Sequence, residues 1–166
     1  MYVGVAAAEI AEKGGKVLGI CNGFQILCES HLLPGVLLRN SHQQFIGKNI
    51  HIKTENGPVL TLPIAHGEGR YFADEETLDE IQSGDQVIYR YCDKQGNISP
   101  AANPNGAVRN IAGICNRTRN VFGMMPHPER ACSEALGNTD GKLILQGLFI
   151  SKKPEFSIRA TELASF

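Results

Sequence analysis

The chain has 166 residues, of which 42% are hydrophobic and 20% charged, and its formal net charge at pH 7 is −1. This composition fits one ordinary globular domain with a real core, and the near-neutral charge gives no reason to expect a nucleic-acid partner. No apolar run approaches a membrane span and no signal peptide is evident, so we expect neither membrane insertion nor export. The five cysteines are unpatterned, which together with these features indicates the reducing cytoplasm.

Strand and helix signals alternate along the chain. The elements expected in chain order are a helix near 3–13, a strand near 16–20, a helix near 22–31, strands near 49–53 and 59–62, a helix near 74–83 with Asp74 as its N-cap, strands near 86–91, 109–115 and 119–125, and a helix near 141–150. This alternation predicts an α/β fold with helices on both faces of a largely parallel or mixed sheet. We expect one domain over 1–150, followed by a tail, 151–166, whose role the sequence does not indicate.

Cys21 has the setting of a catalytic nucleophile. The apolar run from Val17 breaks at Gly-Ile-Cys-Asn-Gly and resumes in a helical pattern, which predicts a sharp elbow between a strand and a helix. Gly19 and Gly23 lie two residues either side of Cys21, where side chains would collide in such a turn. At the N-terminus of the helix, unpaired N–H groups and the helix dipole favour a thiolate, so we expect a lowered pKa for Cys21.

A histidine and a glutamate with matching properties occur near the C-terminal end. His127 lies between Pro126 and Pro128 at the end of a strand-like run, and both prolines restrict the backbone that carries its ring. Glu129 lies two residues further on and can accept the imidazole N–H, fixing the tautomer that leaves the other ring nitrogen free for a nucleophile. The sequence therefore predicts a catalytic triad of Cys21, His127 and Glu129.

The other cysteines and three of the remaining histidines carry no such motif. We expect structural or surface roles for Cys28, Cys92, Cys115, Cys132, His31, His42 and His51. No CxxC and no paired Cys/His spacing typical of a zinc site occurs in the sequence. We therefore expect no metal site.

Five ordered blocks resemble the class I glutamine amidotransferases. They are GICNGFQ (19–25), PIAHGEGRY (63–71), ANPNG (102–106), NIAGICN (110–116) and MPHPERA (125–131). More narrowly, they resemble the glutaminase subunits of phosphoribosylformylglycinamidine synthases, which serve purine biosynthesis. The similarity extends from about residue 14 to residue 149, and it implies a class I amidotransferase-like, flavodoxin-like sandwich.

The resemblance implies hydrolysis of L-glutamine to glutamate and ammonia through a thioester on Cys21. In this family the ammonia passes to a larger synthetase subunit, which uses ATP to aminate formylglycinamide ribonucleotide, and a small accessory subunit completes the complex. The sequence contains no GxxxxGK[ST] phosphate loop. We therefore expect no cofactor in this chain and place ATP and Mg²⁺ on the synthetase partner.

The resemblance also implies a set of substrate-binding residues: Asn22, Gln25, His66, Gly67, Asn105 and Gly106. Gln25 lies one helical turn after Cys21. The segment 65–70 is expected to be a functional loop whose His66 and Arg70 contact glutamine or face the synthetase, with a charged surface turn as the alternative. The stretch 102–106 is also an ordinary turn sequence.

Two departures from the family predict an incomplete chain. Family members have a further strand-helix unit before the elbow, with a Gly-Gly loop that supplies the second oxyanion-hole N–H, and this sequence starts too late to contain it. The backbone N–H of Asn22 is the one donor we name, and losing a donor costs about 100- to 1,000-fold in rate. The segment between Asn56 and Leu62 is also short for the family.

Two functions are alternatives to the glutaminase. One is a non-catalytic or truncated subunit that binds the synthetase, and the other is a related thiol hydrolase or peptidase.

Overall fold

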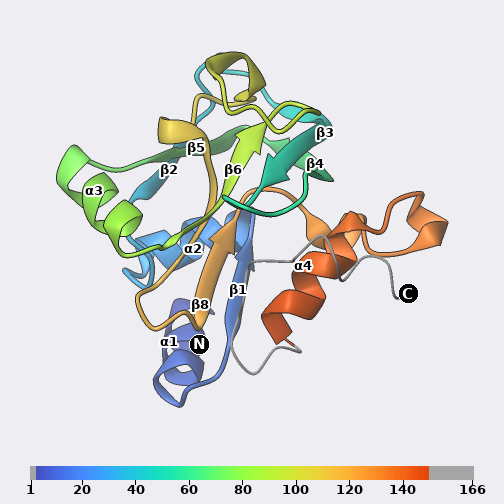
Figure 1. The fold of residues 1–166 in the computed structure, drawn as a ribbon. Coiled ribbons are helices and arrows are strands. Elements are labelled where there is room, and N and C mark those ends of the chain that lie inside the picture. Colours follow the sequence, from blue (N-terminus) through green and yellow to red (C-terminus); the bar gives the residue numbers. More distant parts are fainter. Residues whose placement is uncertain (1–2, 150–166) are drawn as a thin grey trace.

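The computed structural model describes residues 3–149, which form a six-stranded sheet, a two-stranded sheet and flanking helices (Figure 1). In spatial order the large sheet contains β1 (Val17–Ile20), β8 (Val121–Met124), β7 (Ile111–Cys115), β6 (Val87–Cys92), β3 (Ile46–Lys53) and β4 (Leu60–His66). The small sheet pairs β2 (Val36–Arg39) with β5 (Glu68–Phe72). The expected tail over 151–166 lies outside the described residues.

The large sheet is mixed. Within residues 3–149 the β1–β8 pair is parallel, whereas the other strand pairs are antiparallel. The connections 54–59 and 116–120 are too short for a crossover, so β3–β4 and β7–β8 must pair antiparallel. The sequence predicted either a largely parallel sheet or a mixed sheet. The mixed sheet is confirmed.

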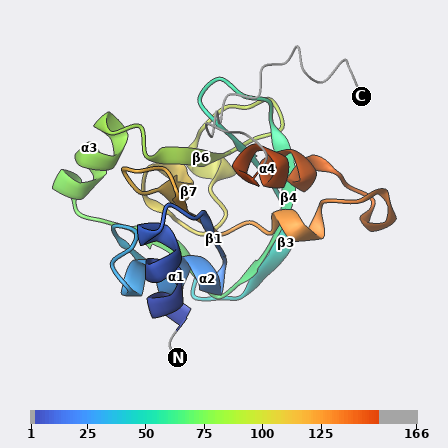
Figure 2. The same ribbon diagram turned by 90° about the horizontal axis from the view of Figure 1, so that it is seen from below.

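Helices cover both faces of the large sheet. The α-helices are α1 (Val3–Glu12), α2 (Asn22–Glu29), α3 (Glu75–Ser83) and α4 (Asp140–Phe149), and the short 3₁₀ turns are η1 (Pro100–Ala102), η2 (Val108–Asn110), η3 (Pro128–Arg130) and η4 (Glu134–Leu136). α2 packs on β1 and β8, whereas α4 packs on β4 and η3. Figure 2 shows α4 on the opposite side of the sheet from α1 and α2. No helix in residues 3–149 is both long and apolar enough to cross a membrane.

The expected helices and most expected strands are present, with ends that differ by a few residues. Asp74 caps α3 as predicted, because its carboxylate accepts the Thr77 N–H at 2.8 Å. The prediction of a loop over 65–70 is wrong: β4 continues to His66 and β5 begins at Glu68. Neither strand of the small sheet was predicted from the sequence.

The helix that follows the elbow is packed between the two sheets. Phe24 of α2 lies over Gly123 of β8, where a Cβ atom would come within 2.1 Å of the Phe24 ring. The same ring stacks on Tyr71 of β5 with centroids 5.8 Å apart. The Tyr71 hydroxyl donates to the Pro34 carbonyl at 2.9 Å. These contacts fix α2, and with it the elbow at its N-terminus, relative to β5.

Candidate active site

Cys21 forms the predicted elbow between β1 and α2. Its φ of 52° and ψ of −108° are unusual for a residue with a side chain, a strain of about 1–3 kcal/mol. Its N–H donates to Met124 O at 2.9 Å, and its carbonyl accepts the Gln25 N–H at 3.2 Å. The elbow is therefore held by a sheet hydrogen bond on one side and by the first bond of the helix on the other.

The two glycines around Cys21 differ in their roles. A Cβ atom on Gly19 would lie 2.6 Å from the backbone of Gly23 and 2.5 Å from the Leu27 side chain, so the predicted collision is confirmed there. A Cβ atom on Gly23 would meet nothing within 4 Å, so the prediction is wrong for that residue. The turn requires a glycine at 19 because the backbone of residue 23 occupies the space.

Cys21 and His127 line one cleft of about 590 Å³. His127 Nδ1 lies 2.6 Å from Glu129 Oε1, and its backbone N–H donates to Pro63 O of β4 at 2.9 Å. His127 Nε2 is buried and has no hydrogen-bond partner within residues 3–149. Glu129 lies behind the ring and outside the cleft lining. The geometry thus arranges His127 as predicted, with one ring nitrogen held by a carboxylate and the other unoccupied.

The thiol of Cys21 does not have the lowered pKa that the elbow predicts. Burial raises its pKa and outweighs the N–H of Asn22 and the charge of Arg130, which both lower it. The Glu129 carboxylate adds a smaller increase. Cys21 Sγ lies 3.9 Å from the carbonyl oxygen of Ala65. The prediction failed because it counted the helix terminus and not the desolvation of the site.

Arg130 is a cleft residue to which the sequence analysis gave no role. Its Nε lies 3.8 Å from Glu129 Oε1, so the carboxylate faces both the His127 ring and a guanidinium. Arg130 directly follows Glu129 in the MPHPERA block (125–131), and this position is the sequence signal that could have identified it.

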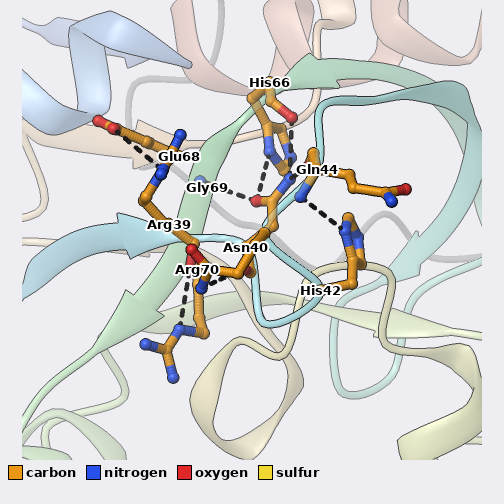
Figure 3. Close-up of polar contacts among 9 residues, drawn as sticks. Arg39, Asn40, His42, Gln44, His66, Glu68, Gly69 and Arg70 are labelled. Carbon is orange, nitrogen blue, oxygen red and sulfur yellow. Dashed lines mark hydrogen bonds and ion pairs between the residues drawn. The ribbon is translucent and has the colours of Figure 1, made fainter.

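His66 is buried and belongs to the cleft, so the surface-turn alternative is wrong for this residue. Its side chain is buried, and Nδ1 lies 3.0 Å from Asn40 Oδ1 (Figure 3). Its Nε2 is buried without a hydrogen-bond partner in the described chain. Burial, followed by the charges of His127 and His42, lowers the pKa of His66 to about 4. His66 is therefore neutral at pH 7.

The other proposed substrate residues divide into two groups. Asn22, Gln25 and Gly67 line the cleft, although Gln25 Nε2 donates to Glu29 Oε1 at 2.9 Å. Asn105 and Gly106 are outside the cleft lining.

The 102–106 turn supports the loop that follows β2. Asn105 is buried and donates to Gly69 O at 2.8 Å, while its carbonyl accepts the Ser41 N–H at 2.9 Å. Gly106 has a φ of 82°, and a Cβ there would lie 2.7 Å from Ser41. Arg70 is also outside the cleft lining, and its Nε donates to Arg39 O at 3.0 Å.

Three of the remaining cysteines are buried. Burial raises the pKa of Cys92 and Cys115 to about 11 and that of Cys28 to about 12, which makes these thiols unreactive. Cys132 is partly exposed, and its Sγ donates to Glu129 O at 3.1 Å. No group of three or more His, Cys, Asp or Glu side chains in the described part of the chain is placed to hold a metal ion.

A strand-to-helix cysteine elbow that shares a cleft with a carboxylate-bound histidine is the arrangement of a cysteine nucleophile with its general base. Residues 6–142 match the family model of the CobB/CobQ-like glutamine amidotransferase domain, and the chain belongs to this family.

The curated relatives are more specific. The chain is 55% identical over 152 residues to phosphoribosylformylglycinamidine synthase subunit PurQ of Acaryochloris marina, covering 85% of this chain and 65% of the relative. It is 51% identical to the protein of the same name from Gloeobacter violaceus, covering 85% and 66%. The chain thus spans less than two thirds of the length of both relatives.

A solved structure is also similar. A chain in the structure of PurLQS from Thermotoga maritima superposes with a TM-score of 0.72 at 37% identity, covering 91% of this chain and 68% of that one.

Proposed function

We propose that this chain is the glutaminase subunit of a phosphoribosylformylglycinamidine synthase and hydrolyses L-glutamine to glutamate and ammonia. The observation that carries the proposal is the cleft shared by Cys21 and His127, in which Glu129 holds the imidazole at 2.6 Å and leaves Nε2 without a partner. The names of the two curated relatives support the choice of synthase.

The first half of the proposed reaction forms a thioester. Glu129 accepts the Nδ1–H of His127, so the lone pair lies on Nε2 and takes the proton from Cys21 Sγ. The thiolate attacks the side-chain carbonyl carbon of glutamine and forms a tetrahedral intermediate. The imidazolium then donates its proton to the amide nitrogen, the C–N bond breaks, and ammonia leaves a glutamyl thioester on Sγ. Because burial raises the thiol pKa, we expect the thiolate to form by this transfer and not to stand free.

The second half regenerates the thiol. His127 Nε2 takes a proton from water as the oxygen attacks the thioester carbonyl, and the C–S bond breaks to give glutamate. The proton on His127 returns to Sγ, so the sum is glutamine and water to glutamate and ammonia. The N–H of Asn22, at the positive end of α2, is the oxyanion donor we assign. A second donor from a Gly-Gly loop stays a prediction.

We infer that the ammonia is used by a synthetase subunit that binds ATP and Mg²⁺, in a complex with a small accessory subunit. The inference is supported by the relatives' name, a synthase subunit, and by the similarity to a chain in PurLQS. We assign no cofactor to this chain. A cytoplasmic location is our proposal, supported by the five free cysteines.

The test uses an electrophilic glutamine analogue and maps the adduct by mass spectrometry. We expect one adduct, on Cys21, that is lost in Cys21→Ala and strongly slowed in His127→Ala. Cys132→Ala is the matched control, because Cys132 is the other cysteine that is not buried, and its removal should leave the adduct unchanged. Labelling spread over all five cysteines would overturn the glutaminase and favour a non-catalytic subunit.

A further inference from the structure

The side-chain amide of Asn40 is held in one orientation by the backbone around it (Figure 3). Its Nδ2 lies 2.8 Å from Gln44 O and 2.9 Å from His66 O, while its Oδ1 lies 3.2 Å from the backbone nitrogen of Gly69. Carbonyl oxygens only accept and backbone N–H groups only donate. If the amide were flipped, its oxygen would face the two carbonyl oxygens and its nitrogen would face the Gly69 N–H, so these hydrogen bonds could not form. The orientation of the amide is therefore fixed.

This orientation determines which nitrogen of His66 carries the proton. Nδ1 lies 3.0 Å from Asn40 Oδ1, which only accepts, so Nδ1 must donate. The ring is neutral, because its pKa is about 4, and a neutral ring with a proton on Nδ1 has a lone pair on Nε2. The ring itself is tightly packed, since a Cβ on Gly69 would come within 2.3 Å of it. His66 therefore presents a fixed acceptor.

Within residues 3–149, no group donates a hydrogen bond to His66 Nε2. Nε2 is buried without a hydrogen-bond partner in residues 3–149, His66 is only 4% exposed, and His66 is among the residues that border the cleft. A buried polar atom left without a partner is costly, and a bound ligand that donates an N–H removes the cost. A ligand N–H placed beside Nε2 would satisfy this atom.

His66 borders the same cleft as Cys21 and His127. The preceding residue, Ala65, has its carbonyl oxygen 3.9 Å from Cys21 Sγ, and the charge of His127 acts on the His66 ring. His127 becomes a cation when it takes the thiol proton, so a second cation, such as the substrate's ammonium group, is disfavoured beside it. The neutral N–H group that the reaction brings here is the side-chain carboxamide.

We propose that His66 Nε2 accepts an N–H of the glutamine carboxamide and selects the amide against the carboxylate of glutamate, with Asn40 as the positioning residue that fixes the tautomer. This inference rests on the proposed function. Glutamate would place an oxygen lone pair against the Nε2 lone pair, so the same atom that binds the substrate disfavours the product.

The variant His66→Asn separates the two ring nitrogens. The Asn amide nitrogen can replace Nδ1–H toward Asn40, whereas nothing replaces Nε2. The probe is the diazoketone analogue of glutamine, which has no carboxamide N–H and alkylates the nucleophile. Relative to the labelling rate of the variant without a protecting ligand, we expect protection of Cys21 by glutamine to weaken about tenfold and protection by glutamate to be unchanged or stronger.

The possible outcomes are distinct. Wild-type chain that is not labelled at Cys21 sinks the proposed function itself. Normal wild-type labelling with glutamine and glutamate protection weakened equally in His66→Asn overturns the inference alone, because a structural role would affect both ligands in parallel.

A second variant and a spectrum test the role of Asn40. In Asn40→Asp the carboxylate favours an imidazolium whose Nε2–H donates, so glutamine protection should weaken while glutamate protection strengthens. Gln44→Ala, which keeps the backbone carbonyl that Asn40 contacts, is the control and should match wild type. If Asn40→Asp does not fold, nitrogen-15 NMR of the wild-type chain decides: an Nδ1–H tautomer at His66 is expected, and an Nε2–H tautomer would overturn the proposal.

Discussion

Two buried histidines border the same cleft, and they differ in what holds Nδ1. His127 Nδ1 faces the Glu129 carboxylate at 2.6 Å, whereas His66 Nδ1 faces the Asn40 amide oxygen at 3.0 Å. In both rings Nε2 is buried without a hydrogen-bond partner in the described residues. A carboxylate stabilises the imidazolium, while an amide oxygen fixes the tautomer without supplying charge. The partner of one ring nitrogen thus determines whether the other nitrogen transfers protons or accepts a hydrogen bond.

Removing the negative charge of Glu129, which faces His127, should have the largest effect on activity. Glu129→Gln keeps the size of the side chain but no longer stabilises the imidazolium, so kcat for glutamine hydrolysis should fall by about 10⁴-fold. KM should change little because Glu129 is outside the cleft lining. The measurement is glutamate release with the synthetase subunit present. A fall of less than about tenfold would show that the two histidines do not differ as we describe.

The neutral state of His66 should appear in the pH dependence of stability. Its pKa is lowered from 6.5 to about 4 by burial and by the facing charges of His127 and His42. Between pH 6.5 and pH 4 the unfolded chain binds a proton at His66 that the native state does not bind, so the free energy of unfolding decreases as the pH falls. The decrease from this group is about 3 kcal/mol between pH 6.5 and pH 4.

Denaturation in urea at several pH values measures this contribution. His66→Asn has no such titration, so its stability should depend less on pH in the same window. Parallel pH profiles for the two proteins would mean that His66 is not held neutral.

The two elbow glycines should respond in opposite directions. Gly19→Ala forces a Cβ into the backbone of Gly23, so the free energy of unfolding should fall by about 2 kcal/mol. Gly23→Ala places a Cβ in open space on α2, and the higher helix propensity of alanine should raise stability by up to about 1 kcal/mol. Urea midpoints of both variants give the answer, and equal losses would refute the packing we describe.

The elbow at Cys21 and the contact between His127 and Glu129 could be predicted from the sequence because each depends on a short local segment. Cys21 is marked by a strand, two glycines and a helix within one short run, and His127 and Glu129 are separated by one residue. The carboxylate–imidazole contact needs only that local backbone.

The partner of His66 could not be predicted in the same way. Asn40 contacts Gln44 within its own loop, but its contacts with His66 and Gly69 are long-range and lie where β2 pairs with β5, and neither short strand has a pattern that predicts it. The raised pKa of Cys21 likewise comes from burial by segments far apart in the chain. Local motifs led to the proposed reacting groups, whereas the environment of these groups depends on tertiary packing.

The most direct test of the central claim is to capture the intermediate on Cys21. The chain is mixed with carbon-labelled glutamine in the presence of the synthetase subunit, quenched in acid and analysed by peptide mass spectrometry. We predict a labelled glutamyl thioester on the peptide that contains Cys21, without the amide nitrogen, and its absence in Cys21→Ala. Steady release of glutamate with no label on Cys21 would contradict the account.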